Sequence, residues 1–270
     1  MQTETHTQAV IDAVKNIGEH FRENFRKADI PQSLPDFMNA LKAIEEQCFQ
    51  ALKENLLRHY PHVPWIDDDE FDGATQQRPA PYERYWLCDT MDGAVQYLRH
   101  IPGWTINLVL IEHGEPVLAI IYDPLSKELF HAEKNNGAYR NGIRIGVQKP
   151  TAAEIMLGVL EYGHQLKTSP VWKATVSASF TTLLEHFSTV RNYGPHGLQL
   201  AYVAAGRIDL FVQHDLDTHN WLAGVLIAKE AGATIVNAAG MGWQWGDDSL
   251  LVGTDESIAL YRNNHTTKQS

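Results

Sequence analysis

The stretch Trp86–Gly103, which reads WLCDTMDGAVQYLRHIPG, constrains the fold of this chain most strongly. A β-rich run leads directly into Asp89, and Asp92-Gly93 then opens a helical pattern that continues to Leu98. The pattern predicts a strand-to-helix corner that carries two carboxylates, with free backbone N–H groups just beyond them. Carboxylate oxygens suit hard cations such as Mg²⁺, and the amides of a helix start suit phosphate. The corner is therefore either a metal and phosphate site or a plain capped Asp-x-x-Asp-Gly turn, and this stretch alone leaves both open.

The first half of the chain predicts two helices followed by antiparallel strands. Apolar residues recur at helical spacing over residues 7–27 and again over 37–56, with prolines between the two runs. Residues 63–71 form a short apolar strand that ends in four consecutive acids. From Trp104 onward, β-branched runs alternate with turns that contain Gly, which predicts an antiparallel meander.

The second half has a different pattern, because strands and helices alternate along it as in layered α/β packing. We predict an α+β chain in which residues 1–150 form an N-terminal half with the metal and phosphate site. Residues 151–262 form a C-terminal α/β half that completes this site. The polar tail 263–270 is predicted to be disordered.

Composition narrows the classes of function. The net charge of −11 argues against nucleic acid and against an anionic membrane surface as partners. Two cysteines are too few for a disulfide framework, which fits a reducing compartment. The N-terminus does not read as a signal peptide and no run reaches the length of a membrane span, so we expect a cytoplasmic protein.

The motifs together resemble one known family. The stretch WLCDTMDGAVQYLRHIP, which begins at Trp86, resembles the block W-x-x-D-P-[IL]-D-G-T-x-N-[FY]-x-x-x-x-P of the inositol monophosphatase superfamily. Members of that superfamily are Mg²⁺-dependent, lithium-sensitive phosphatases. GLQLAYVAAGRIDLFVQ and the helix that ends at Glu230-Ala231-Gly232 are similar to two later blocks of that family. The resemblance runs from about Val63 to Asp255 and includes the two N-terminal helices.

This resemblance implies a layered αβαβα sandwich, with an antiparallel sheet in the first half and a mixed sheet in the second. It implies hydrolysis of a small phosphorylated polyol, sugar or nucleotide by a metal-activated water, with Mg²⁺ as the cofactor. It also implies a homodimer.

The resemblance assigns site residues one by one. The metal ligands it implies are Glu70, Asp89, Met91 through its backbone carbonyl, and Asp92. The three acids among them, Glu70, Asp89 and Asp92, are also the implied catalytic residues. Gly93 and Ala94 would offer backbone N–H groups to the substrate phosphate.

Several positions depart from the family pattern where its chemistry lies. Ala94 replaces the threonine that orients the attacking water, and Leu41 stands where its partner aspartate is expected. Asn220 replaces an aspartate ligand, so it would bind metal more weakly. Loss of a water-orienting pair would lower the rate of hydrolysis by roughly 10²–10⁴-fold. The leading hypothesis is a phosphatase with weak activity, and the alternative is a catalytically degenerate pseudoenzyme that binds a ligand or a protein.

Histidines near the late block offer another metal set. His214, Asp215, Asp217 and His219 lie within six residues and could recruit Mn²⁺ or Zn²⁺ in place of Mg²⁺. The simpler interpretation is a polar surface loop. His196 either faces the substrate pocket or is an ordinary residue at the start of a helix.

Overall fold

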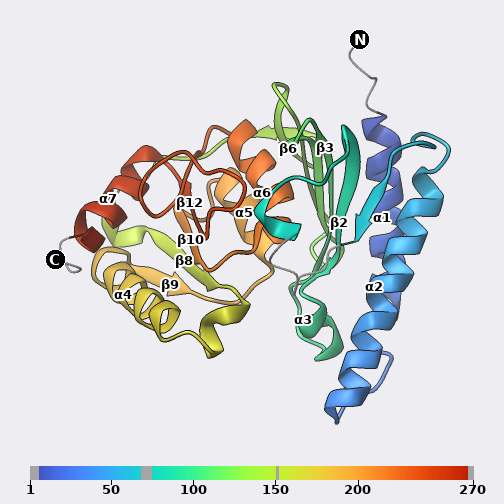
Figure 1. Cartoon of the computed structure of the whole chain (residues 1–270), viewed down its shortest axis with the longest axis horizontal. Helices are drawn as coiled ribbons and strands as arrows, with labels where there is room; N and C mark the ends of the chain where they lie inside the picture. The colour runs from blue at the N-terminus through green and yellow to red at the C-terminus, as the bar shows by residue number, and fades with distance from the viewer. Residues whose placement is uncertain (1–5, 68–74, 150–151, 267–270) are drawn as a thin grey trace.

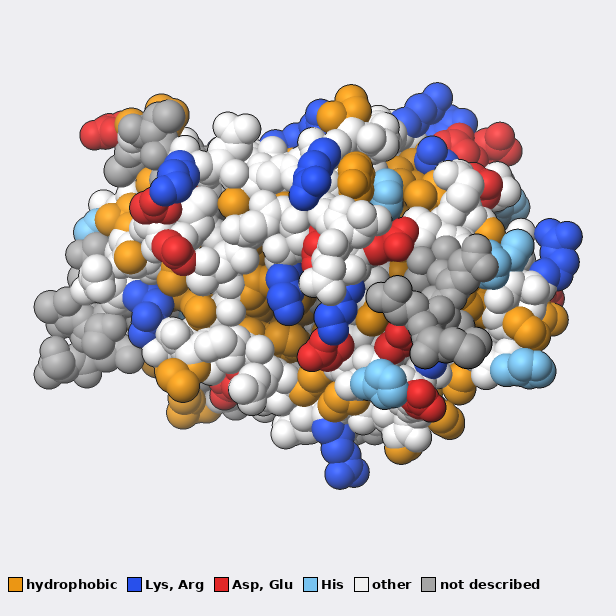
Figure 2. All heavy atoms as spheres, turned by 90° about the horizontal axis from the view of Figure 1, so that it is seen from above, with side chains coloured by type: hydrophobic (Ala, Val, Ile, Leu, Met, Phe, Trp, Pro, Cys, Tyr) orange, Lys and Arg blue, Asp and Glu red, His pale blue; other side chains and the backbone are white. Residues whose placement is uncertain are grey.

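The structure is a computed structural model that describes residues 6–67, 75–149 and 152–266. Its elements form five layers, in the order helices, sheet, helices, sheet, helices (Figure 1). The layered fold that the sequence predicted is therefore confirmed. No helix within the described ranges is both long and apolar enough to cross a membrane. On the face shown in Figure 2, acidic and basic side chains are interspersed rather than gathered by sign.

The first outer layer is the pair of predicted helices, α1 (Thr7–Asn24) and α2 (Leu34–Leu56). The Ser33 hydroxyl accepts a hydrogen bond from the Asp36 amide at the start of α2, and Pro35 stands in the first turn, where its missing N–H costs nothing. Each helix buries an apolar stripe, which includes Val14 and Phe21 on α1 and Leu52 on α2.

In the part of the chain that the structure describes, the first sheet has seven strands in sequence order. They are β1 (Trp65–Asp67), β2 (Arg84–Asp92), β3 (Thr105–Glu112), β4 (Glu115–Asp123), β5 (Glu128–Glu133), β6 (Gly137–Arg140) and β7 (Ile143–Ile145). From β2 to β7 the pairing is antiparallel, as the meander pattern predicted. β1 departs from that pattern because it pairs in parallel with β2, which requires a crossover connection.

Both faces of this sheet are buried, so its strands read as apolar runs. On β2, Trp86 and Cys88 join the core under α1 and α2, whereas Tyr85 and Leu87 join the core on the opposite face. The alternation that follows from the strand repeat thus divides one strand between two cores. By the same alternation, Asp89 lies on the face of the sheet that carries Tyr85 and Leu87, away from α1 and α2.

The middle layer consists of α5 (His196–Ala204) and α6 (Thr218–Glu230), which pack against each other and against the first sheet. The second sheet has the strand order β11-β12-β10-β8-β9 and mixes parallel with antiparallel pairs. Its strands are β8 (Leu157–Tyr162), β9 (Thr189–Arg191), β10 (Leu210–His214), β11 (Thr234–Val236) and β12 (Ser249–Gly253).

The last layer is formed by α4 (Pro170–His186) and α7 (Asp255–Thr266), which pack together over the second sheet. Leu183 of α4 and Tyr261 of α7 lie in the core beneath them. α7 extends to Thr266, so the helix includes the first residues of the tail that composition predicted to be disordered. The polar composition of that segment did not prevent a helix, because α7 is anchored by its buried N-terminal turns.

Candidate active site

Asp89 and Asp92 lie at the end of β2, and a bulge brings their side chains together. In a regular strand a spacing of three residues would place them on opposite faces of the sheet. Here Asp89 pairs with Asn107 and Asp92 pairs with Thr105, so β2 carries one extra residue between the two aspartates. As a result the Asn107 side-chain amide lies 3.4 Å from Asp89 Oδ2 and donates to Asp92 Oδ2 at 3.0 Å. Each aspartate is only 8% exposed.

The start of α5 closes over Asp92. The backbone amide of His196 donates to Asp92 Oδ1 at 3.2 Å, and that of Gly197 donates to Asp92 Oδ2 at 2.7 Å. Burial raises the pKa of Asp92, although the charge of His196 and these hydrogen bonds oppose the rise. Asp92 therefore joins the first sheet to the middle helical layer.

The His196 side chain lies between two further buried carboxylates. Its Nδ1 is 3.1 Å from Asp217 Oδ2, and its Nε2 is 3.7 Å from Glu161 Oε2. Burial would lower the pKa of His196, but the hydrogen bond with Asp217 and the nearby Glu161 carboxylate raise it well above its ordinary value. In return, the hydrogen bond and charge of His196 outweigh burial and lower the pKa of each carboxyl. The arrangement therefore favours a charged imidazole between two charged carboxylates.

Buried amides fix this cluster in place. Gln199 Nε2 donates to Glu161 Oε1 at 2.8 Å, and Gln213 Nε2 donates to Asp217 Oδ2 at 2.8 Å. The Trp221 indole N–H in turn donates to Gln213 Oε1 at 2.7 Å. Asn220 Nδ2 donates to Asp217 Oδ1 at 2.7 Å, so Asn220 reaches the cluster as a hydrogen-bond donor.

The corner after Asp92 has the predicted form. Gly93 adopts a left-handed backbone (φ 90°), and α3 (Ala94–Leu98) begins immediately after it. The first amides of such a turn have no acceptor within the helix, which leaves them to an outside group such as a phosphate. Ala94 is 7% exposed and presents only a methyl group here.

We expect Gly93→Ala to destabilise the protein more than an ordinary glycine replacement. A Cβ at Gly93 would lie 2.7 Å from the Gly103 carbonyl oxygen, whereas one at Gly142 (φ 78°) meets nothing within 4 Å. Gly142→Ala therefore reports backbone strain alone, roughly 1–3 kcal/mol. Urea unfolding should show a larger loss for Gly93→Ala than for this control, and equal losses would contradict the close approach.

From α2, Cys48 forms a hydrogen bond to this corner. Its buried thiol donates to the Thr90 carbonyl at 2.9 Å, and burial, reinforced by the charge of Asp89, raises the pKa of Cys48 well above its ordinary value. Leu41 lies about two turns earlier on the same helix and packs, partly buried, against apolar neighbours. The sequence analysis did not single out Cys48 as a site residue.

Asp217 brings the late His/Asp run into contact with the cluster. Asp217 contacts His196, whereas His214 Nε2 lies 2.7 Å from the Ser179 hydroxyl and Asp215 accepts from the Gln165 amide at 2.6 Å. Among the described residues, no three His, Cys, Asp or Glu side chains are arranged as a ready metal site. Within the described ranges, the run is therefore not gathered into the transition-metal set that its composition suggested.

The chain matches the inositol monophosphatase family over residues 2–268. It belongs to this family. It is 26% identical to an inositol-1-monophosphatase of Rhizobium meliloti over 263 residues, which cover 94% of this chain and 92% of that protein. It is 25% identical to the Nus factor SuhB of Escherichia coli K12 over 246 residues, which cover 90% and 87% of the two chains.

A solved inositol monophosphatase from Anabaena has the same fold. It superposes with a TM-score of 0.78 at 22% identity, and the match covers 97% of this chain and 94% of that one. The two chains therefore share one fold although most of their residues differ.

Four buried amide or acid side chains of the site were not found from the sequence, namely Asn107, Glu161, Gln199 and Gln213. Asn107 is a polar residue within the apolar strand TINLVLIE, and Glu161 ends the apolar part of β8. A buried polar residue in an apolar strand is the signal that was available, because such groups need hydrogen-bond partners. Glu70, which the resemblance names as a metal ligand, lies outside the described residues.

The donors present fit a hard divalent cation on the Asp89 side of the site. Asp89 and Asp92 offer clustered carboxylate oxygens, which is the ligand type that Mg²⁺ prefers. On the Asn220 side, the fit is poor, because the Asn220 amide nitrogen faces Asp217 and the charged His196 imidazole contacts that same carboxylate. The arrangement therefore suits one cation better than two.

Proposed function

We propose that this inositol monophosphatase family member is a divalent-metal-dependent phosphomonoesterase that acts on a small phosphorylated polyol, sugar or nucleotide. The observation that carries the proposal is the convergence of buried Asp89 and Asp92 on the Asn107 amide, beside the first amides of α3, which have no acceptor within that helix. Burying two carboxylates this close together is unfavourable unless positive charge balances them. A divalent cation would supply that charge.

Each residue would have a distinct role. Asp89 and Asp92 would hold the cation, together with Glu70 and the Met91 backbone carbonyl. The bound cation would polarise the phosphate and make a bound water more acidic. The amides of Gly93 and Ala94 would bind the phosphate oxygens. The backbone amide of His196, which donates to Asp92 Oδ1, would hold that carboxylate in position.

The missing threonine and aspartate predict a slow enzyme that two substitutions should accelerate. We expect Ala94→Thr combined with Asn220→Asp to raise the rate of phosphate release by about 10²-fold or more, because a water-orienting hydroxyl and a ligand charge are restored. The measurement is phosphate release from a panel of phosphomonoesters while Mg²⁺, Mn²⁺ and Zn²⁺ are each titrated. An unchanged or lower rate would mean that this chain orients its water by other residues.

A second candidate function is binding without turnover, by a ligand- or protein-binding module. It is supported by the engagement of Asn220 with Asp217 and by the Nus factor names of several relatives. The same assay separates the two candidates. A natural protein that releases no phosphate beside an active double variant would favour the binding module.

A further inference from the structure

A separate cavity lies at the far end of α6 from the candidate active site. It has a volume of about 500 Å³, opens to solvent, and is bordered by the end of α6, the β3–β4 and β5–β6 turns and the loop that follows β11. Lys229, which lines it, is nine residues beyond Asn220, or about 14 Å along the helix. The volume is within the usual range for pockets that hold small molecules.

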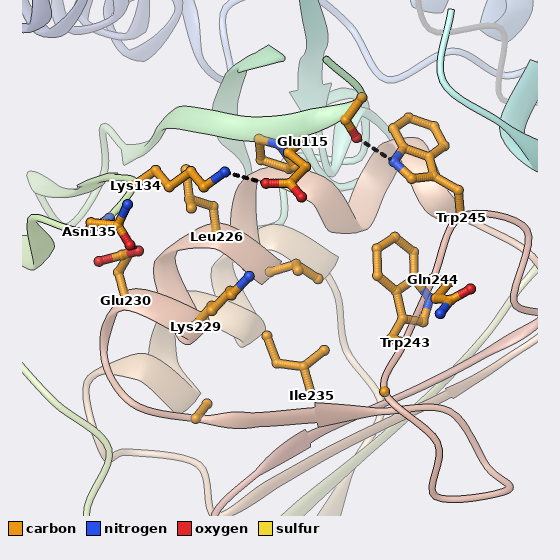
Figure 3. Close-up of a pocket in the computed structure, with 15 residues that line it drawn as sticks. Glu115, Lys134, Asn135, Leu226, Lys229, Glu230, Ile235, Trp243, Gln244 and Trp245 are labelled. Atoms are coloured by element: carbon orange, nitrogen blue, oxygen red, sulfur yellow. Dashed lines mark hydrogen bonds and ion pairs between the residues drawn. The ribbon is translucent and has the colours of Figure 1, made fainter. Parts of the chain in front are cut away.

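Much of the cavity wall is aromatic and aliphatic. The Trp245 indole N–H donates to the Gly114 carbonyl at 2.8 Å, which fixes one wall. Trp243 packs edge-on against the buried Trp221, with ring centroids 6.1 Å apart. Leu226 and Ile235 complete this wall, as Figure 3 shows. Fixed indole faces of this kind suit a flat, apolar ring system.

Among the described residues around the cavity, Lys229 is a cation without an ion pair of its own, although, beside the hydrogen bond from Lys134, its charge helps to lower the pKa of Glu115. Lys134 forms an ion pair with Glu115 at the upper edge in Figure 3. Both oxygens of Glu230 accept backbone hydrogen bonds, from the amides at positions 135 and 137. Lys229 forms no ion pair with any residue that the structure describes, and its ammonium group lies in the middle of the cavity (Figure 3).

We propose that this cavity binds a small molecule that combines a flat aromatic ring system with one anionic group. The ring would stack between Trp243 and the aliphatic side chains of Leu226 and Ile235, and the anion would pair with Lys229. Neither feature belongs to the Asp89 and Asp92 site, so this site does not depend on the phosphatase proposal. A charge-assisted hydrogen bond from Lys229 would contribute most of the preference for an anion.

The test uses the full chain and 2-naphthoate as the probe, with 2-naphthalenemethanol as the matched neutral compound. The indole N–H signals of the seven tryptophans are followed by ¹⁵N NMR, and Trp243→Phe and Trp245→Phe identify the two signals at the cavity. We expect 2-naphthoate to shift those two signals at millimolar concentration and the neutral compound to bind about tenfold more weakly.

Two lysine variants test the role of charge. Lys229→Gln should weaken naphthoate binding about tenfold and leave the neutral compound unchanged, because one charge-assisted hydrogen bond is lost. Lys173→Gln, on the exposed surface of α4, should change neither. The proposal is overturned if naphthoate binds Lys229→Gln as tightly as the natural protein. It is also overturned if the two cavity signals do not shift.

Discussion

Asp89→Asn is expected to reduce phosphate release by about a thousandfold or more without unfolding the protein. A bound divalent cation contributes several kcal/mol of transition-state stabilisation, and each 1.4 kcal/mol is a factor of ten in rate. Replacing one carboxylate by an amide removes a formal charge from the cation site while it keeps the side-chain shape. The initial rate of phosphate release at saturating Mg²⁺ is the measurement.

Asp209→Asn is the matched control for this experiment. Asp209 precedes β10, at the end of that strand opposite His214, and its Oδ2 accepts from the Leu157 amide at 2.7 Å. The Asp209→Asn substitution therefore removes a hydrogen-bonded carboxylate that lies outside the candidate site. An Asp89→Asn protein that keeps the rate of this control would show that Asp89 holds no essential cation.

The second large effect is on stability, and it concerns His196. His196→Leu should lower the free energy of unfolding by about 3 kcal/mol, because it leaves Glu161 and Asp217 buried without their shared cation. Urea unfolding at neutral pH measures this loss. The other hydrogen bonds of the two acids, from Gln199 and Gln213, remain in place and limit the cost.

A charge-neutral variant distinguishes lost charge from lost packing. Adding Glu161→Gln and Asp217→Asn to His196→Leu removes the uncompensated charges, so most of the stability should return. If the triple variant stays as unstable as His196→Leu alone, the contribution of His196 is packing, and the ion cluster does not stabilise the fold.

Much of the fold follows from local patterns in the sequence. The helical spacing of α1 and α2 and the turns of the β3–β4 hairpin are short-range features, and the structure has these elements where they were expected. The Asp89-x-x-Asp92-Gly93 corner is also local. Its convergence on one face depends on the bulge in β2, which the sequence does not reveal because it is set by pairing with β3.

The His196 cluster could not be derived in the same way. Its acids come from β8 and from the start of α6, and they meet His196 only when the second sheet packs on the middle helices. Periodicity gives no information on contacts between such distant segments. Each partner looks like an isolated polar residue in the sequence.

The register of α2 shows a related limit. Leu41 and Cys48 lie on one side of the helix, because seven residues are close to two full turns. An alignment of α2 with the family pattern that is shifted by one or two helical turns therefore matches the apolar stripe almost equally well. The assignment of Leu41 to the position of the missing aspartate therefore stays a prediction, and Leu41 packs against the same apolar cluster as Ala94. The thiol that donates to the Thr90 carbonyl belongs to Cys48.

The most direct test of the account is phosphate release by the unmutated protein, with and without a divalent cation. Turnover of at least one phosphomonoester that needs added Mg²⁺, Mn²⁺ or Zn²⁺ and stops with a chelator is the predicted result. The absence of phosphate release with every substrate and cation, beside an active Ala94→Thr/Asn220→Asp protein, would contradict it.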